Sequence, residues 1–408
     1  MAQVLLVTTN YWPEPTGIAV YTTDLAKSLQ DSGFDVSALT SLPHYPWWKV
    51  PSEFAHLAEG ITRHESVEVI RAKHLVPPRM NAFMRIRFES SLWWNLRRVS
   101  RSFVRKDFDA VIACIPTVAA GLVGKSIAGK LGIPFGLIVQ DLSGAGAKQS
   151  GLRGGAIFSK AALAVEGAVL NAADSLVVVS PAMRDVVLGL GVASAKVSQI
   201  ANYSARNIES QARDVSRAEF GWPDDEFVVL HTGNMGAKQD LENVVKAAKV
   251  LGSDAKVKIF LVGHGNQEAN LKELCKGLEN IAVMDAVADG QYSMLLAAAD
   301  LLLVNERSTQ MEMSLPSKLT SYLFSERPVI AAVPRGGATW RFLEGIAELV
   351  ESGDPKKLAE KIVDLKNNPE RRRELATLGA KFARENLDPE IGREKYLIWV
   401  RNLIQYKA

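Results

Sequence analysis

The stretch Phe227-Val-Val-Leu-His231-Thr-Gly-Asn-Met-Gly-Ala-Lys238-Gln-Asp-Leu-Glu242 shows how the second half of this chain folds. It begins as a short apolar run, passes through a glycine-containing loop and continues into a segment whose apolar residues recur at helical spacing through residue 251. A buried strand followed by an amphipathic helix is the unit of a parallel sheet with right-handed crossovers. The stretch therefore predicts the first strand and helix of an α/β domain.

The same alternation continues on both sides of this stretch. Apolar runs predict further strands at residues 258–262, 281–284, 301–304 and 329–332. In the first half, similar runs occupy residues 4–8, 35–40, 67–70, 110–114, 134–140 and 175–179, and a helix is expected over 17–30. The sequence thus predicts an α/β fold of two tandem doubly wound, Rossmann-like domains facing a cleft.

The domain boundaries follow from length and composition. A chain of 408 residues exceeds the size at which one hydrophobic core stops growing, so two domains are expected. A polar segment after residue 202 marks the linker, which gives domains at residues 1–203 and 204–388. The amphipathic segment at 389–408 is expected to form a helix that packs back on the N-terminal domain.

Composition narrows the class of protein. A net charge of +3 is too small to indicate nucleic-acid binding. The six histidines and two cysteines show no metal-ligand spacing, so neither a metal nor another cofactor is expected. The start of the chain lacks the pattern of a signal peptide, and no apolar run approaches the roughly 20 residues of a spanning helix. We therefore expect a cytoplasmic protein, or one peripheral on the inner face of the cell membrane.

Two loops of the second half carry residues suited to an anion. Gly233, Asn234, Gly236 and Lys238 follow the strand at 227–231, at the edge where parallel sheets bind ligands. Backbone N–H groups and a lysine in this position favour a phosphate; a strand-to-helix turn with a solvated lysine is the alternative. Gly263 and Gly265 end the next strand, where they predict a contact with a base or a ribose.

A third element of the second half is Leu315-Pro-Ser317-Lys318-Leu319. Ser317 can cap a helix, and Lys318 falls in its first turn. A cation there opposes the helix dipole, which indicates that Lys318 has a negative partner. That partner is either a bound anion or a nearby carboxylate such as Glu312.

Three residues of the first half are candidates at the same edge of its sheet. Gly17 begins a helix after the first strand, where it either admits an anion or only makes the turn. His44 lies in an aromatic loop that stacks either on a sugar or lipid or on its own rings. Asp141 directly follows a strand, where it either accepts a proton from an alcohol or caps the next turn.

Residues 79–106 carry eight basic residues against one acid. Their apolar residues share one helical face, with two tryptophans beside it. Such a helix either binds an anionic membrane surface or turns a solvated basic face to water over a core helix. The sequence leaves both readings open.

Taken together, these motifs resemble the family 4 glycosyltransferases with the GT-B architecture. The resemblance rests on residues 11–17, 42–46, 139–141 and 178–183 in the first half, and on 232–236, 261–265, 297–300, 316–319 and 327–331 in the second. The subgroup it is most similar to builds colanic acid and O-antigen, and includes fucosyl and N-acetylfucosaminyl transferases.

The resemblance implies a retaining sugar transfer, without a required metal, from a UDP- or GDP-sugar to a lipid-linked or polysaccharide-precursor acceptor. The C-terminal domain would bind the nucleotide sugar. Its diphosphate would lie on the loop around Gly236 and Lys238, with Ser317 and Lys318 opposite and Gly17 approaching from the other domain. The acceptor would enter the N-terminal domain over His44 and Asp141, so His44, Asp141 and Lys318 are the implied catalytic residues.

One position departs from the family pattern. The family carries two glutamates eight residues apart, the second of which contacts ribose; here the second position is Ser321 and the first is Met313, with Glu312 one residue away. Ser321, Glu312, Gly263 and Gly265 are therefore the candidate nucleoside contacts.

Two other functions fit an α/β chain of this design. A nucleotide-sugar epimerase also has two Rossmann-like domains, and would isomerise or hydrolyse the donor without an acceptor. A two-domain sugar-binding protein would bind a free sugar and catalyse nothing.

Overall fold

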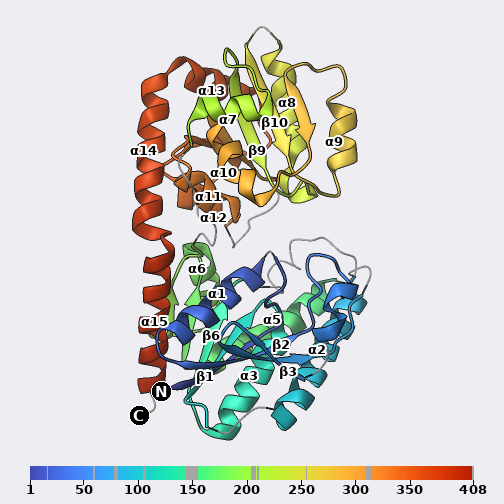
Figure 1. Cartoon of the computed structure of the whole chain (residues 1–408), viewed down its shortest axis with the longest axis vertical. Helices are drawn as coiled ribbons and strands as arrows, with labels where there is room; N and C mark the ends of the chain where they lie inside the picture. The colour runs from blue at the N-terminus through green and yellow to red at the C-terminus, as the bar shows by residue number, and fades with distance from the viewer. Residues whose placement is uncertain are drawn as a thin grey trace. The chain divides into compact units, whose positions relative to one another are not determined.

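The computed structural model describes residues 1–15, 17–57, 60–77, 81–103, 107–142, 155–203, 208, 211–253, 255–308 and 315–406. The chain divides into two compact units (Figure 1). Unit 1 consists of Met1–Ala205 together with Pro389–Ala408, and unit 2 is Arg206–Asp388.

Unit 1 is built on an eight-stranded sheet in the order β3-β4-β2-β1-β5-β6-β7-β8. All neighbouring strands pair parallel except β3 with β4. The strands are β1 Gln3–Thr8, β2 Asp35–Ser41, β3 Gly60–His64, β4 Val67–Ala72, β5 Ala110–Ile115, β6 Phe135–Val139, β7 Ser175–Val178 and β8 Val197–Gln199. Central strands such as β1, β2, β5 and β6 are buried along almost their whole length because helices cover both faces of the sheet.

The helices of unit 1 form two layers around this sheet. They are α1 Ile18–Asp31, α2 Ala82–Phe103, α3 Val118–Leu131, α5 Gly155–Ala172, α6 Pro181–Gly189 and α15 Pro389–Gln405, with short 3-10 turns η1 Ser52–Leu57 and η2 Ser194–Lys196. Helices α1 and α15 share one core cluster with the sheet, and α2 packs beside α3.

The C-terminal helix α15 is an integral part of unit 1. Trp399 is 5% exposed, and its Nε1 donates to Ser175 Oγ at 2.8 Å. A Cβ on Gly136 of β6 would stand 2.6 Å from Leu403 Cδ2, so this glycine lets the helix lie directly on the sheet. Arg393 donates two hydrogen bonds to Asp24 of α1, at 3.0 and 2.6 Å.

Unit 2 has a six-stranded parallel sheet in the order β11-β10-β9-β12-β13-β14. Its strands are β9 Phe227–Thr232, β10 Val257–Val262, β11 Ile281–Met284, β12 Leu301–Asn305, β13 Val329–Val333 and β14 Glu348–Glu351. The first strand β9 is central, so the chain crosses over it between β11 and β12. At such a reversal of strand order the carboxyl edge of the sheet leaves a crevice for a ligand.

The helices of unit 2 also lie on both sides of its sheet. They are α7 Arg213–Phe220, α8 Leu241–Leu251, α9 Glu268–Leu274, α10 Tyr292–Ala297, α11 Lys318–Phe324, α12 Ala338–Leu343, α13 Pro355–Asn367 and α14 Pro369–Asn386, with 3-10 turns η3 Ala237–Gln239 and η4 Asp289–Gln291. Helices α8, α9 and α13 contribute to one core cluster, and α11 packs against α14.

The prediction of an α/β fold with two parallel-dominated sheets is confirmed, and every strand expected from an apolar run is present. Three strands were not predicted: β3, β8 and β14. All three lie at sheet edges, and their burial alternates or is partial, so they lack the apolar run that marks a central strand.

Candidate functional site

Two glycine-containing loops meet at the carboxyl edge of the unit 2 sheet, after β9 and β10. Gly233 N donates to Val262 O at 2.8 Å, and Met235 N donates to His264 O at 2.8 Å. A Cβ on Gly263 would stand 2.0 Å from Gly233 O, and one on Gly265 would stand 2.4 Å from Met235 O. Gly263 and Gly265 are therefore required by the packing of one loop on the other, a reason that does not depend on a nucleoside.

Lys238 lies in the 3-10 turn η3, which separates the loop from α8. The sequence had suggested that the lysine leads directly into the helix. Instead, Asp240 lies between them with φ 45°, and this left-handed residue separates the turn from α8. Buried Asn305 holds this turn: its Nδ2 donates to Gln239 O at 2.8 Å and to Asp240 O at 3.0 Å. Lys238 O in turn accepts from Arg307 N at 2.9 Å, which ties the lysine's backbone to the end of β12.

Lys318 begins α11, and its ammonium donates to the side chain of a histidine on β9. Lys318 Nζ lies 3.0 Å from Nε2 of His231, which is fully buried. His231 Nδ1 lies 3.1 Å from Leu303 O; since a carbonyl only accepts, Nδ1 carries the ring proton and Nε2 is the acceptor. Burial, and then the Lys318 charge, lower the pKa of His231 well below its ordinary value, so the ring is neutral.

Lys238 and Lys318 line one cavity with Glu306. The cavity holds about 70 Å³ and is also lined by Gln239, Val304, Asn305 and Pro316. Desolvation lowers the pKa of Lys318 to about 7, and the Glu306 charge opposes that shift. Glu306 follows β12, is 7% exposed, and its Oε1 accepts from Thr339 Oγ1 at 2.7 Å. The structure thus brings together two cations that are eighty residues apart in sequence, beside one carboxylate.

The remaining predicted residues of unit 2 have mixed outcomes. Ser317 occupies the N-cap position of α11, but its hydroxyl makes no capping hydrogen bond, because its backbone is already helical at φ −57° and ψ −26°. The predicted capping role is therefore wrong. Ser321 is 6% exposed on the same helix. Asn234 is exposed beside Gly236, and Glu312 lies outside the described residues.

In unit 1, buried Glu14 joins the two loops that follow β1 and β2. Its Oε1 accepts from the backbone N–H groups of His44 at 2.7 Å and Tyr45 at 2.9 Å, and its Oε2 accepts from Asn10 Nδ2 at 2.7 Å. His44 itself is 3% exposed, and its ring lies 4.6 Å from the ring of His74, centroid to centroid. Burial lowers the pKa of His44, and the Glu14 charge opposes the shift.

The aromatic loop after β2 packs partly on itself and partly on Phe88 of α2 and on His74. The rings of Tyr45 and Trp48 are 6.1 Å apart, and those of Trp47 and Phe54 are 5.7 Å apart. Tyr45 and Trp48 each remain 37% exposed. The loop's rings thus pack on one another and on neighbouring elements, with two rings partly open to solvent, and whether the loop stacks on a sugar or lipid stays a prediction.

Gly17 and Asp141 both take part in local turns. Gly17 has φ 68° and ψ −143° at the N-cap of α1, and a Cβ there would lie 3.2 Å from Tyr45 Cε1. Its turn thus requires a glycine. Asp141 is exposed at the carboxyl end of β6, and its Oδ1 accepts from Leu142 N at 2.8 Å. Its second carboxylate oxygen has no hydrogen bond within the described part of the chain.

Helix α2 is the basic amphipathic helix of the sequence. Phe88, Leu92, Leu96 and Val99 are buried along one side, as predicted. The opposite side exposes the apolar side chains of Phe83, Ile86 and Trp94, at 64%, 46% and 64%, beside Arg87, Arg98 and Arg101. We call these six residues the α2 face. Arg79, Arg105 and Lys106 lie outside the described residues.

The acid of this helix is turned away from the α2 face. Glu89 Oε2 accepts from Ala119 N at 3.1 Å, and its Oε1 accepts from Arg85 Nη2 at 3.0 Å. No helix in the described ranges is both long enough and apolar enough to cross a membrane.

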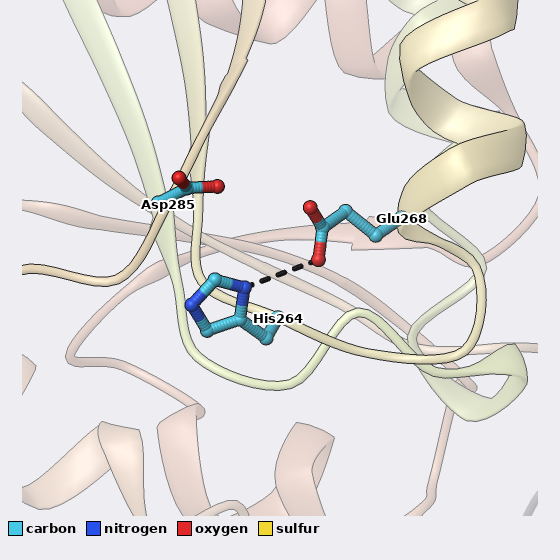
Figure 2. Close-up of side chains that lie close together, drawn as sticks. All are labelled: His264, Glu268 and Asp285. Atoms are coloured by element: carbon cyan, nitrogen blue, oxygen red, sulfur yellow. Dashed lines mark hydrogen bonds and ion pairs between the residues drawn. The ribbon is translucent and has the colours of Figure 1, made fainter.

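Within the described residues, one group of side chains has the spacing of metal ligands: His264, Glu268 and Asp285 (Figure 2). His264 Nδ1 lies 3.1 Å from Glu268 Oε2. Lys272 Nζ lies 2.7 Å from Glu268 Oε1 and 3.6 Å from Asp285 Oδ1. Because the Lys272 ammonium pairs with both carboxylates, the group is explained as a surface ion-pair cluster.

Sequence reasoning missed His231, Asn305, Glu306 and Glu14 as site residues. A weak signal existed for two of them: His231 is a polar residue at the end of a wholly buried strand, and Glu306 directly follows another. The partners of His231 lie 72 and 87 residues away in sequence, and the partner of Glu306 lies 33 residues away. Sequence spacing therefore did not reveal these contacts.

Comparison with known families gives the class. Residues 16–203 match the glycosyl transferase 4-like domain, and residues 212–382 match the glycosyl transferases group 1. The chain belongs to the group 1 glycosyltransferases of GT-B architecture and is an enzyme of that class.

Similarity to individual proteins is more distant. The chain is 28% identical over 331 residues to a protein of Escherichia coli described as a colanic acid biosynthesis glycosyl transferase, WcaI; the match covers 79% of this chain and 81% of WcaI. Among solved structures, it is similar to the sucrose-phosphate synthase of Thermosynechococcus elongatus, with a TM-score of 0.76 and 17% identity over 99% of this chain and 100% of the other. It also resembles HepE of Anabaena in complex with UDP, with a TM-score of 0.73 and 17% identity; the match covers 98% of this chain and 100% of HepE.

Proposed function

We propose that this glycosyltransferase moves a sugar from a UDP- or GDP-sugar to a lipid-linked or polysaccharide-precursor acceptor in cell-surface polysaccharide synthesis, with retention at the anomeric carbon and without a metal. The observation that carries the donor site is the cavity of unit 2 that Lys238 and Lys318 line together. The description of the relative WcaI and the UDP found in HepE support the pathway and the ligand class.

In the proposed reaction, the two lysines act on the leaving group. The bond between the sugar's anomeric carbon and the diphosphate oxygen breaks, and the nucleoside diphosphate departs with the electron pair. Lys238 and Lys318 stabilise this developing negative charge, a contribution that commonly reduces the barrier by about 3–4 kcal/mol per donor. They replace the charge that a metal ion would otherwise supply.

The other half of the reaction is assigned to unit 1. An acceptor hydroxyl forms the new bond to the anomeric carbon and loses its proton to Asp141, whose carboxylate is exposed at the edge of the sheet. Buried His44 and the glycine turn at Gly17 shape the loops after β2 and β1 of the same unit. Gly263, Gly265 and Ser321 would border the nucleoside.

The test is transfer from labelled UDP- and GDP-sugars to a lipid extract that contains the saccharide precursors. Lys318→Ala and Lys238→Ala are each expected to lower transfer about 100-fold or more while circular dichroism stays that of the wild type. Exposed Lys381→Ala, on α14, is the matched control and is expected to transfer normally. Full turnover in both site variants would reject this donor site.

The same assay separates the competing functions. An epimerase would isomerise or hydrolyse the donor when no acceptor is present. A sugar-binding protein would bind a free sugar tightly and a nucleoside diphosphate not at all. Domain-wide matches to glycosyltransferase families favour the transferase over both.

We also propose that the enzyme works at an anionic membrane surface through the α2 face. Exposed phenylalanine and tryptophan side chains beside three arginines suit the boundary between lipid headgroups and acyl chains. The inward position of Glu89 leaves this face without a carboxylate of its own helix. A lipid-linked acceptor would be met at that surface, on the cytoplasmic side.

A further inference from the structure

We propose that His231 is a positioning residue that holds Lys318 as a cation for the donor diphosphate, so that donor binding depends on pH through this lysine–histidine pair. The inference rests on the proposed function of the Lys238–Lys318 cavity and extends it to a residue of the buried strand beneath it.

The geometry fixes the role of the histidine. His231 has no exposed surface, and its two ring nitrogens have different partners: Nδ1 donates to Leu303 O at 3.1 Å, and Nε2 accepts from Lys318 Nζ at 3.0 Å. The bond to Leu303 O favours the tautomer that carries its proton on Nδ1, in which Nε2 presents a lone pair to the lysine; the backbone carbonyl of Asn234 is a second acceptor beside the ring. The Nε2 lone pair accepts a charge-assisted hydrogen bond from the ammonium form of Lys318. The neutral amine makes a weaker bond to the same lone pair, so the contact favours the ammonium form.

Such support matters because the surroundings of Lys318 oppose its charge. Desolvation lowers its pKa to about 7, and the charge of Glu306 counteracts part of that effect. Of the other described titratable groups, Lys238 lines the same cavity and His231 contacts the ammonium. At neutral pH, Lys318 is thus close to evenly divided between its two forms.

A diphosphate would shift this balance. The anion favours the ammonium form, so binding above pH 7 takes up a proton at Lys318, and affinity falls as pH rises through the lysine's pKa. The sign follows from the charge: the cationic lysine binds the anion, so binding is strongest below the lysine's pKa and weakens above it. The terminal phosphate of a nucleoside diphosphate titrates near pH 6, so the informative window is about pH 6.5–9.

Two substitutions at position 231 separate the role of Nε2 from that of the buried ring. In His231→Asn, the amide nitrogen can keep the bond to Leu303 O, but no acceptor reaches Lys318. In His231→Gln, the longer side chain places an amide oxygen near the position of Nε2. A hydrogen bond to a charged group contributes about 1.5–3 kcal/mol, so its loss is expected to lower the midpoint of the pH profile by about one unit.

The experiment measures the affinity of the full chain for UDP and for GDP between pH 6.5 and 9 by calorimetry. The wild type is expected to lose affinity with a midpoint near neutrality. His231→Asn should move the midpoint down by about one unit, which is roughly tenfold weaker binding at pH 8, and His231→Gln should restore it. Lys238→Ala should weaken binding at every pH and leave the midpoint in place.

A second measurement needs no variant at position 231. Binding enthalpies at pH 8 in buffers of different ionisation enthalpy report the protons taken up; the wild type should take up close to one and Lys318→Ala none.

The outcomes distinguish the two proposals. If neither nucleotide binds, or if Lys318→Ala binds as the wild type does, the proposed donor site is wrong and the inference falls with it. If Lys318 is needed but His231→Asn keeps the wild-type midpoint, or the wild type takes up no proton, the inference about His231 alone is overturned.

Discussion

At the scale of single residues, the loops after β9 and β10 depend on positions where a side chain has no room. Gly263 has φ 146°, and backbone atoms of the β9 loop occupy the space of its missing Cβ. These contacts place the backbone of Gly233 and Met235 through two hydrogen bonds of 2.8 Å. The position of the loop that carries Lys238 is thus set by glycines of the neighbouring loop.

Gly263→Ala is therefore expected to destabilise unit 2 by about 2–4 kcal/mol, because the Cβ would overlap Gly233 O and force the loops apart. Urea unfolding, with hydrogen exchange of the β9 and β10 amides, measures the effect. Gly290→Ala is the control, since nothing lies within 4 Å of its Cβ position. If the two variants had the same free energy of unfolding, the close packing of the two loops would not contribute to stability, contrary to this prediction.

The sequence indicated Lys238 from its loop after a strand and Lys318 from its place at a helix start, and the family resemblance implied that the two belong to one site. It did not predict His231 or Glu14. Their roles depend on which residues of distant segments meet, and local patterns do not contain that information. The sequence also did not predict that Gly263 and Gly265 make room for a loop, while their contact with a nucleoside stays a prediction.

At the scale of elements, helix α2 combines a structural side and an exposed side. Its buried leucines and Phe88 complete the core, as the helical spacing predicted. The sequence left open whether the basic side meets lipid or water. The structure adds that three apolar side chains stand among the exposed arginines and that Glu89 is used to bind the backbone at the start of α3.

If the α2 face binds anionic lipid, Arg98→Gln with Arg101→Gln should weaken binding to phosphatidylserine-containing vesicles by about 2 kcal/mol, or roughly 30-fold at low salt. Vesicle sedimentation measures this, and Trp94→Ala should weaken binding independently of salt. Lys381→Gln, on α14, serves as the control for loss of an exposed charge. Equal sedimentation of all variants, or equal binding to neutral vesicles, would contradict a membrane role for this face.

The sequence predicted central strands but missed edge strands and the 3-10 turn before α8. Central strands such as β1 and β9 were predicted because both of their faces are buried, which leaves an uninterrupted apolar run. Edge strands such as β3 are covered on fewer sides, so polar residues interrupt the run. The insertion of η3 before α8 depends on the left-handed conformation of Asp240, which the residue type permits but does not impose.

At the scale of the whole molecule, the chain forms two α/β units, and its last helix returns to the first. Trp399 and Leu403 of α15 pack where Gly136 leaves β6 bare, and Asp24 accepts from both Arg393 and Tyr203. The amphipathic pattern of residues 391–404 indicated this packing, but not the glycine that permits it. Unit 1 therefore needs both ends of the chain to complete its core.

The central claim is that unit 2 binds the donor's diphosphate through Lys238 and Lys318. Thermal unfolding of the full chain with UDP, GDP, ADP or TDP tests it most directly, because a ligand that binds only the folded state stabilises it. At about 100 times its dissociation constant, the correct nucleotide should add about 2.7 kcal/mol, or roughly 5–10 °C, to the wild type and little to Lys318→Ala. Stabilisation of both proteins to the same extent, or of neither by any of the four, would contradict the account.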